Sequence, residues 1–184
     1  MANITQLSKF LALILRHKAD DHNLQLDEYG FVDTKDVWAI IEDQFGNKYK
    51  YDDLLKVVAG DKYGKKRYEI VDGRIRAMFG HSKVREIEYP IVAPPSFLYH
   101  GTSKEAVESI KKTGLQARSR QYVHMTTNLD NANRVANRHS QNTVILQIHA
   151  LDAHNNGIVF HQPEAEHFLC KYIPSQYINF DSIE

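Results

Sequence analysis

The sequence is poor in features that would place it outside the cytoplasm. Its 184 residues include one cysteine, Cys170, so neither a disulfide framework nor a cysteine-rich zinc site is available. No apolar run approaches the roughly 20 residues that span a bilayer. The first residues also lack the charged-then-apolar order of a signal peptide. We therefore expect a cytoplasmic protein that does not enter a membrane.

The chain also lacks an excess of charge of either sign, because 23 Lys and Arg residues offset 23 Asp and Glu residues. Nonspecific wrapping of nucleic acid needs a basic face, so the balance argues against it and leaves local anion sites open. Lys and Arg do concentrate over residues 62–76, which is also typical of a solvated hairpin. A hydrophobic share of 42% indicates a globular chain rather than a disordered one.

Several nucleotide-binding and metal-binding motifs are missing. There is no GxGxxG or Walker loop, which excludes the Rossmann and P-loop classes. The ten histidines include no His-Glu-x-x-His or comparable spacing, so we expect no metal site. The acidic residues of the second half form no suggestive pair, which disfavours acid–base catalysis by two carboxylates.

Proline is scarce except in one segment. Three of the five prolines fall between Tyr89 and Pro95. Because proline fixes φ and removes a hydrogen-bond donor, this stretch predicts an extended linker at 90–95. The linker divides the chain into lobes at 1–89 and 96–184.

The first lobe has the pattern of a winged helix. Apolar residues at helical spacing predict an opening helix with Thr5 as its N-cap: Leu7, Phe10, Leu11, Ile14 and Leu15. A second helix follows Asp33 or Thr34, and a third covers about 51–59 and ends before Gly60. Asp72-Gly73 between two alternating runs, 67–71 and 74–78, predicts a β-hairpin.

The second lobe has the pattern of a mixed α+β domain. Its expected strands cover 97–100, 122–125, 143–148, 158–160 and 168–170. One helix is expected from a Ser103 cap to Lys112, with Gly114 just beyond its end. Another is expected over 130–139.

Four groups of cationic or small residues are candidates for chemistry. Arg16-His17 ends the first helix, where a guanidinium and an imidazole could clamp a phosphate and move a proton. His100-Gly101-Thr102 lies between an expected strand and an expected helix, where a ligand can approach the backbone. Each group taken alone indicates ordinary structure more than a site: a helix end that suits the dipole, or a routine turn.

The other two groups lie further along the second lobe. Arg120 and His124 are four residues apart, so an extended strand would direct both to one side. Arg138-His139 closes the expected helix before the most apolar strand. Taken alone, these are also typical of a polar pair at a strand edge and of a cationic helix end.

Together these pieces resemble the RNA 2′-phosphotransferase family, known in bacteria as KptA. Five matching segments follow the family's order through nearly the whole chain: Ser8-Lys9-Phe10-Leu11 to Leu15-Arg16-His17, Lys66-Arg67-Tyr68, Arg76-Ala77-Met78-Phe79-Gly80-His81-Ser82, Leu98-Tyr99-His100-Gly101-Thr102, and the run formed by Gly114-Leu115 with Arg120 to Met125. One such match is modest, whereas five in the same order at sensible spacing are specific.

The resemblance implies a fold, a co-substrate and a set of site residues. It implies an α+β protein with an N-terminal winged-helix lobe, which binds RNA, and a C-terminal ADP-ribosyltransferase-like lobe, which binds NAD. The family's essential Arg-His-Arg-Arg set falls on Arg16, His17, Arg67 and Arg120. Its NAD pocket falls on His100, Gly101, Thr102 and His124, with Arg138 and His139 nearby.

The chain departs from the family pattern at a few positions. Tyr122 replaces the first histidine of a His-Val-His element, and Phe79 stands where glutamine is common. The spacing over 61–66 is longer than usual, so Arg67 is assigned through Tyr68. Arg118 competes with Arg120 as the fourth member of the Arg-His-Arg-Arg set, and the spacing to the strand favours Arg120.

The family's reaction has two steps and fits this inventory of residues. The RNA 2′-phosphate first displaces nicotinamide from NAD. The neighbouring ribose hydroxyl then attacks that phosphate, which leaves RNA with a 2′-hydroxyl and ADP-ribose with a 1″,2″-cyclic phosphate. We expect the three arginines to hold the phosphate in a cleft between the lobes and His17 to protonate the departing oxygen.

Two other functions remain open. An ADP-ribosyltransferase that stops after the first step would cap nucleic-acid phosphates. A winged-helix regulator would bind DNA and sense NAD without turnover, although zero net charge disfavours it. On the favoured hypothesis the partner is RNA that carries a 2′-phosphate, and the protein is a monomer.

Overall fold

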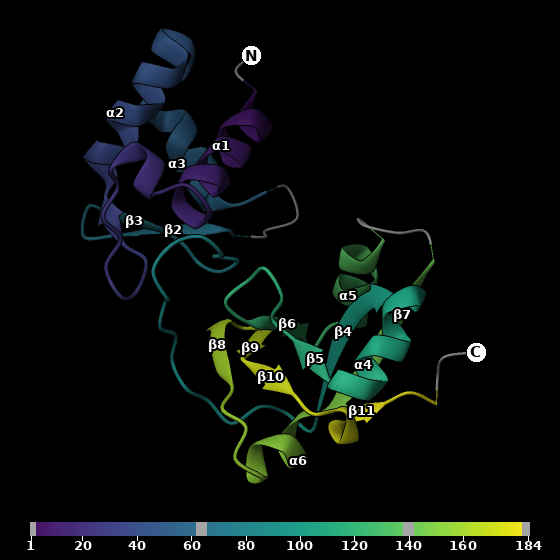
Figure 1. Cartoon of the computed structure of the whole chain (residues 1–184). Helices are drawn as coiled ribbons and strands as arrows, with labels where there is room; N and C mark the ends of the chain where they lie inside the picture. Colours follow the sequence, from purple (N-terminus) through teal and green to yellow (C-terminus); the bar gives the residue numbers. More distant parts are fainter. Residues whose placement is uncertain (1–2, 62–65, 138–141, 182–184) are drawn as a thin grey trace. The chain divides into compact units, whose positions relative to one another are not determined.

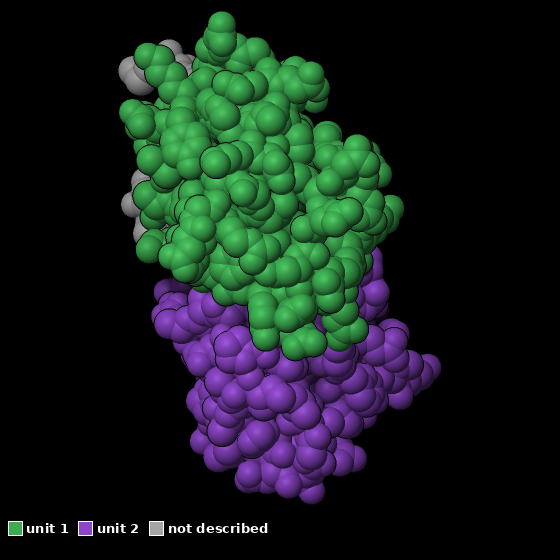
Figure 2. Space-filling model, turned by 90° about the vertical axis from the view of Figure 1, so that its left-hand side faces the viewer, with its two compact units in different colours: residues 1–88 green, residues 89–184 purple. Residues whose placement is uncertain are grey.

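The chain divides by its internal contacts into two compact units. The computed structural model describes residues 3–61, 66–137 and 142–181. Residues 1–88 form unit 1 and residues 89–184 form unit 2 (Figures 1 and 2). Within the described residues, no helix has both the length and the apolarity to cross a membrane.

Three helices build the core of unit 1. They are α1 (Ile4–Arg16), α2 (Thr34–Phe45) and α3 (Tyr51–Ala59). Short 3₁₀ turns follow the first two, at Asp20–His22 and Gly46–Lys48. The apolar stripe of α1 is fully buried, as predicted, at Leu7, Leu11, Ile14 and Leu15.

The helix caps agree with the sequence in one case and not in another. Asp33 caps α2, because its carboxylate accepts a hydrogen bond from the amide of Lys35. The prediction that Thr5 caps α1 is wrong. The helix begins at Ile4, and the side chain of Asn3 accepts from the amide of Gln6.

A three-stranded antiparallel sheet completes unit 1. Its strands are β1 (Val32–Asp33), β2 (Tyr68–Val71) and β3 (Arg74–Ala77), in the order β1-β3-β2. Asp72 and Gly73 turn the chain between β2 and β3 with φ values of 49° and 75°. Two positive φ angles are the requirement of a type I′ turn, so the predicted hairpin is confirmed.

Unit 2 is built on a six-stranded antiparallel sheet in the order β11-β7-β4-β6-β9-β8. Its strands are β4 (Phe97–Ser103), β6 (Val123–Thr126), β7 (Thr143–His149), β8 (His161–Glu164), β9 (His167–Cys170) and β11 (Ile178–Asn179). A second sheet pairs β5 (Leu115–Gln116) with β10 (Tyr172–Ile173). The core lies under the six-stranded sheet and is built around Leu98, Met125, Leu146 and Phe168.

Helices cover the sheet of unit 2. They are α4 (Val107–Thr113), α5 (Leu129–Ala136) and α6 (Ala150–Asn155), with 3₁₀ turns at Lys104–Ala106 and Ser175–Tyr177. Gly114 ends α4 with a φ of 72°, as predicted for the helix C-terminus. The sequence did not predict α6, and the strand expected at 158–160 begins at His161 instead.

Residues 89–92 pair with the segment that leads into β8. The amide of Val92 donates to the carbonyl of Phe160 at 2.9 Å, and Gln162 donates to Pro90 at 3.2 Å. An isolated bridge joins Ile91 to His161. The start of the proline-rich segment is therefore ordered against unit 2.

Candidate functional site

In unit 1, hydrogen bonds join the end of α1 to the loop after β3. The amide of Ser82 donates to the carbonyl of Arg16 at 3.1 Å, which satisfies one of the carbonyls that a helix end leaves without a partner. The hydroxyl of Ser82 lies 2.7 Å from Nδ1 of His17. Two segments that are 65 residues apart in sequence thus form one structure.

Aromatic rings and a glycine confine the guanidinium group of Arg16. Its central carbon lies 5.7 Å from the ring centroid of Tyr68 and 5.4 Å from that of Phe79. Nη2 donates to the carbonyl of Arg67 at 3.5 Å. A Cβ at Gly80, which has a φ of 90°, would lie 3.4 Å from Nη1 of Arg16. The absence of a side chain at Gly80 therefore leaves room for the guanidinium.

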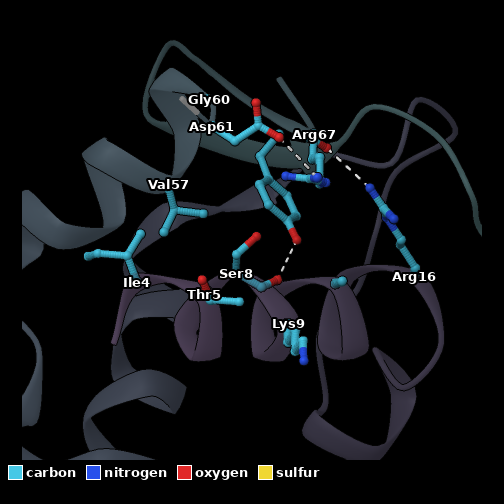
Figure 3. Close-up of a pocket in the computed structure, with 11 residues that line it drawn as sticks. Ile4, Thr5, Ser8, Lys9, Arg16, Val57, Gly60, Asp61 and Arg67 are labelled. Carbon is cyan, nitrogen blue, oxygen red and sulfur yellow. Dashed lines mark hydrogen bonds and ion pairs between the residues drawn. The ribbon is translucent and has the colours of Figure 1, made fainter. Parts of the chain in front are cut away.

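Arg67 lies in a pocket of about 390 Å³ beside Arg16. Figure 3 shows its guanidinium group between Arg16 and Asp61, and Nη2 of Arg67 lies 3.2 Å from Oδ2 of Asp61. The pocket extends along α1 past Ser8 and Lys9, and Arg16 and Arg67 bring two guanidinium groups to it. This arrangement suits an anion, and Asp61 offsets part of the positive charge.

His81 lies in the loop after β3, between Gly80 and Ser82, and is almost entirely buried. Burial and, to a smaller extent, the positive charges of Arg16, His17 and Arg76 together lower the pKa of its imidazole to about 3. His81 is therefore neutral at physiological pH, which avoids a fourth cation in the cluster.

His100 lies inside β4 and is held in one orientation. Its Nδ1 donates to the backbone carbonyl of His124 at 2.8 Å. Burial lowers the pKa of His100, and so do the positive charges of Arg120 and Arg118. The ring is therefore neutral, with its lone pair on Nε2. Such a ring can accept a hydrogen bond from a hydroxyl or amide of a ligand.

His124 belongs to a chain of side chains across three strands. Its Nδ1 lies 2.8 Å from Nε2 of His167 on β9. Nδ1 of His167 in turn lies 3.7 Å from Oε1 of Glu164 on β8. Within the described residues, no group of three or more His, Cys, Asp and Glu side chains could hold a metal ion.

Gly101 and Arg120 lie in settings that differ from those predicted. His100-Gly101-Thr102 is part of β4 and not a turn before a helix. A Cβ at Gly101 would lie 2.6 Å from the carbonyl oxygen of Ala132, so this glycine lets α5 pack against β4. Arg120 lies in a turn before β6, with its amide bonded to the carbonyl of Ala117, so the argument from an extended strand is wrong.

The two departures from the family pattern contribute to packing. Phe79 supports the guanidinium of Arg16, as described above. Tyr122 is buried, and its ring meets those of Tyr89 and His161 edge-on at 5.6 and 5.4 Å. Nζ of Lys171 lies 4.1 Å from the Tyr122 ring centroid.

The structure brings Arg16 and Arg67 together in the pocket of unit 1, whereas His17, which bonds Ser82, is not among the residues that line it. In unit 2, His100 and Thr102 lie on β4 and His124 lies on the neighbouring strand β6. Arg138 and His139 lie outside the described residues. That Arg120 serves as the third phosphate-binding arginine stays a prediction. The sequence did not identify the side chains that hold these groups in place: Asp61, Tyr68, Ser82, Glu164 and His167. Only Tyr68 and Ser82 carried a signal, since both lie in the segments that resemble the family.

Comparison with known sequences places the chain in a family. The family described as "RNA 2'-phosphotransferase, Tpt1 / KptA family" matches residues 2–172. A "Probable RNA 2'-phosphotransferase" of Acetivibrio thermocellus is 37% identical over 182 residues, which cover 98% of this chain and 99% of the relative. A protein of the same name in Fusobacterium nucleatum is also 37% identical, over 98% of this chain and 100% of its own length.

The similarity extends to archaea. A "Probable RNA 2'-phosphotransferase 2" of Archaeoglobus fulgidus is 36% identical over 180 residues, which cover 97% of this chain and 81% of the relative. The matched range includes the α1 end, the loop after β3 and the strands that carry His100, His124 and His167. The chain belongs to the RNA 2′-phosphotransferase, Tpt1 / KptA family.

Proposed function

We propose that this protein is an NAD-dependent RNA 2′-phosphotransferase. It removes an internal 2′-phosphate from RNA and transfers it to ADP-ribose, releasing nicotinamide and ADP-ribose 1″,2″-cyclic phosphate. The observation that carries the proposal is the pocket of unit 1, which both Arg16 and Arg67 line and in which Arg16 donates to the backbone carbonyl of Arg67. Membership of the family supports RNA as the substrate, and we assign its 2′-phosphate to that pocket.

Unit 1 holds the phosphate in this proposal. A phosphate monoester is largely dianionic at neutral pH, with a second pKa near 6, so it needs no base to act as a nucleophile. Two guanidinium groups orient its oxygens and spread the charge that develops when the phosphoryl group is transferred. Tyr68 and Phe79 keep Arg16 in place before substrate arrives, which preorganises the site.

His17 supplies the proton in the second step. The leaving group is the 2′-oxygen of RNA, which must be protonated as the bond to phosphorus breaks. Nδ1 of His17 bonds Ser82, which fixes the plane of the ring. Nε2 is then the atom that gives up the proton.

The side chains of unit 2 fit a dinucleotide such as NAD. His100 is neutral and offers a lone pair on Nε2, which suits a ribose hydroxyl or a carboxamide. Arg118 and Arg120 lie close enough to affect its pKa, and guanidinium groups suit a pyrophosphate. We assign Thr102 and His124 to the same pocket. When bound, NAD supplies an electrophilic ribose carbon whose leaving group is nicotinamide.

The architecture supports this division of roles. In unit 1, three helices precede a β-hairpin, which is the order of a winged-helix domain, and we propose that it binds the RNA. In unit 2, an antiparallel sheet carries the histidines of the proposed NAD pocket, and we propose that it is an ADP-ribosyltransferase-like domain. Arg120 is the candidate for a third arginine on the phosphate.

The direct test uses a short RNA with one internal 2′-phosphate. With NAD, we expect loss of the phosphate and release of one nicotinamide per RNA, and without NAD no reaction. Arg16→Ala and Arg67→Ala should each slow the second step at least 100-fold, so that RNA with ADP-ribose on its 2′-phosphate accumulates. Arg74→Ala is the control, since Arg74 pairs with Asp27 and does not line the pocket.

Other outcomes would identify a different function. Normal turnover in both pocket variants would rule out their role as phosphate clamps. A stable ADP-ribosylated RNA in the unaltered protein would favour a transferase that caps phosphates. Binding of duplex DNA with no release of nicotinamide would favour a regulator.

A further inference from the structure

Three adjacent strands of unit 2 bring a carboxylate and two imidazoles into a row. His124 on β6 lies opposite Leu169 on β9, so His167, two residues from Leu169, is its diagonal neighbour on the same face. On the other side of β9, Glu164 lies directly opposite His167. An irregularity between His161 and Glu164 shifts the register of β8 and produces this pairing.

The distances connect Glu164, His167 and His124 into a chain of interacting side chains, called the relay below. Nδ1 of His124 lies 2.8 Å from Nε2 of His167, which is the length of a hydrogen bond. Nδ1 of His167 lies 3.7 Å from a carboxylate oxygen of Glu164, within the range of an electrostatic pair. The side chains of His167 and Glu164 are 14% and 24% exposed, so water screens this pair only in part.

The carboxylate fixes the direction of the relay. A hydrogen bond between two imidazoles needs one N–H and one lone pair. With Glu164 next to Nδ1 of His167, a proton on that nitrogen is attracted, whereas a lone pair would be repelled. The lone pair of His167 is then on Nε2 and accepts from Nδ1–H of His124. This leaves the lone pair of His124 on Nε2.

The backbone of His124 is held at the same time. Its carbonyl accepts a hydrogen bond from Nδ1 of His100, on the neighbouring strand β4. His124 is thus fixed by two bonds, one to its carbonyl and one to its ring. Glu164 and His167 influence only the ring, so their effect can be separated from the fold of the strand.

We propose that Glu164 and His167 are positioning residues that hold His124 as the Nδ1–H tautomer, so that its Nε2 accepts a hydrogen bond from a hydroxyl of the bound dinucleotide. This inference rests on the proposed function for the identity of the ligand. The tautomer of His124, however, is a property that the protein has without any ligand. The relay therefore has a test that does not depend on catalysis.

The first experiment measures the tautomer of His124 in the ligand-free protein by ¹⁵N chemical shifts of its imidazole. We expect Nδ1–H in the unaltered protein and in His167→Gln, whose amide oxygen can accept the same hydrogen bond. In His167→Phe we expect a shift toward the Nε2–H form, because the acceptor is gone. An Nε2–H ring in the unaltered protein, or no change in His167→Phe, would overturn the proposal.

The second experiment compares steady-state constants for NAD in the full-length variants. His167→Phe should raise KM for NAD about 10-fold with a smaller change in kcat, the scale of one lost hydrogen bond. His167→Gln should recover most of the loss, and Glu164→Gln should show an intermediate rise. His149→Phe is the control, because His149 lies on β7 and its ring contacts Phe97.

The two experiments separate failure of the relay from failure of the function. If the tautomer behaves as expected but the protein neither binds nor consumes NAD, the proposed function fails and the relay stands. If NAD is consumed and His167→Phe matches His149→Phe in KM, the relay fails and the function stands. Glu164→Gln keeps the result informative should the aromatic replacement unfold unit 2.

Discussion

The hydroxyl oxygen of Ser82 lies 2.7 Å from Nδ1 of His17, and the same residue donates its amide to the carbonyl of Arg16 at 3.1 Å. One serine therefore closes the end of α1 and also orients the imidazole that follows it. The second role bears on the proposed catalysis, since His17 as the proposed general acid must present its proton in a fixed direction. The two roles are separable because one uses the backbone and the other the side chain.

Ser82→Ala should lower kcat with little loss of stability. The substitution keeps the amide that closes α1 and removes only the bond to His17. We expect kcat to fall about 5- to 10-fold and the free energy of unfolding to fall by about 1 kcal/mol, the typical value of one hydrogen bond. Single-turnover rates and urea unfolding measure these two quantities.

A serine on the other unit provides the comparison for this variant. Ser109 is exposed on α4, and Ser109→Ala should leave the rate unchanged. If Ser82→Ala also turns over at the normal rate, Ser82 has no part in orienting His17.

Gly80→Ala should weaken the binding of phosphorylated RNA. The new Cβ would lie 3.4 Å from Nη1 of Arg16, in close van der Waals contact, and would restrict the movement of the guanidinium group. Because Gly80 also has a φ of 90°, the substitution strains the backbone by about 1 kcal/mol or more. We expect KM for the RNA to rise about 5-fold, which initial rates at varied RNA concentration will measure.

Gly46→Ala separates strain from contact. Gly46 also has a positive φ, 57°, but nothing lies within 4 Å of the position of its Cβ. Its variant should lose a similar amount of stability and keep the normal KM for RNA. An equal rise of KM in both variants would mean that backbone strain, and not the contact of the new Cβ with Arg16, explains the weaker binding of RNA.

Local sequence signals predicted much of unit 1. The apolar stripe from Leu7 to Leu15 predicted α1, and Asp72-Gly73 predicted the hairpin, because each depends on neighbours in sequence. The same approach failed at His100-Gly101-Thr102, where the glycine suggested a turn. There the glycine serves a contact with α5, whose residues lie about 30 positions later in the chain.

The residues of the candidate site also fall into those that the sequence identified and those that it did not. The resemblance identified Arg16, His17 and Arg67, which carry the proposed chemistry. It did not identify Glu164 and His167, because their relation to His124 depends on the pairing of β6, β9 and β8 and on an irregularity in β8. The register between strands is set by the whole sheet, so no local sequence pattern predicts that Glu164, His167 and His124 lie next to one another.

Asp61→Asn should strengthen the binding of phosphorylated RNA. The carboxylate of Asp61 lies 3.2 Å from Nη2 of Arg67 and repels an approaching phosphate. The pair is about one-third exposed, so the effect is modest, and we expect KM for the RNA to fall about 2- to 4-fold at low salt. The difference should shrink at 0.5 M salt, because screening weakens interactions between exposed charges.

Asp52→Asn is the matched control, since Asp52 lies exposed on α3 outside the pocket. Its KM should equal that of the unaltered protein at both salt concentrations. A rise of KM in Asp61→Asn would show instead that Asp61 helps binding by holding Arg67 in place.

His81→Gln should make unit 1 less sensitive to acid. In the folded protein, burial and nearby cations lower the pKa of His81 to about 3, whereas the unfolded chain has the ordinary value near 6.5. Between these values the unfolded state binds the proton more readily, so the stability due to a neutral His81 is present above pH 6.5 and is lost as the pH falls.

The size of this loss is measurable with the single tryptophan, Trp38, which lies on α2 and reports the unfolding of unit 1. Between pH 7 and pH 5, His81 should account for a loss of about 2 kcal/mol in the free energy of unfolding. In His81→Gln, the free energy of unfolding should decrease by about 2 kcal/mol less than in the unaltered protein over the same pH range. Each protein is compared with its own value at pH 7. Equal losses in both proteins would mean that His81 takes up a proton in the folded state, so that the cluster of Arg16, His17 and Arg76 tolerates another positive charge.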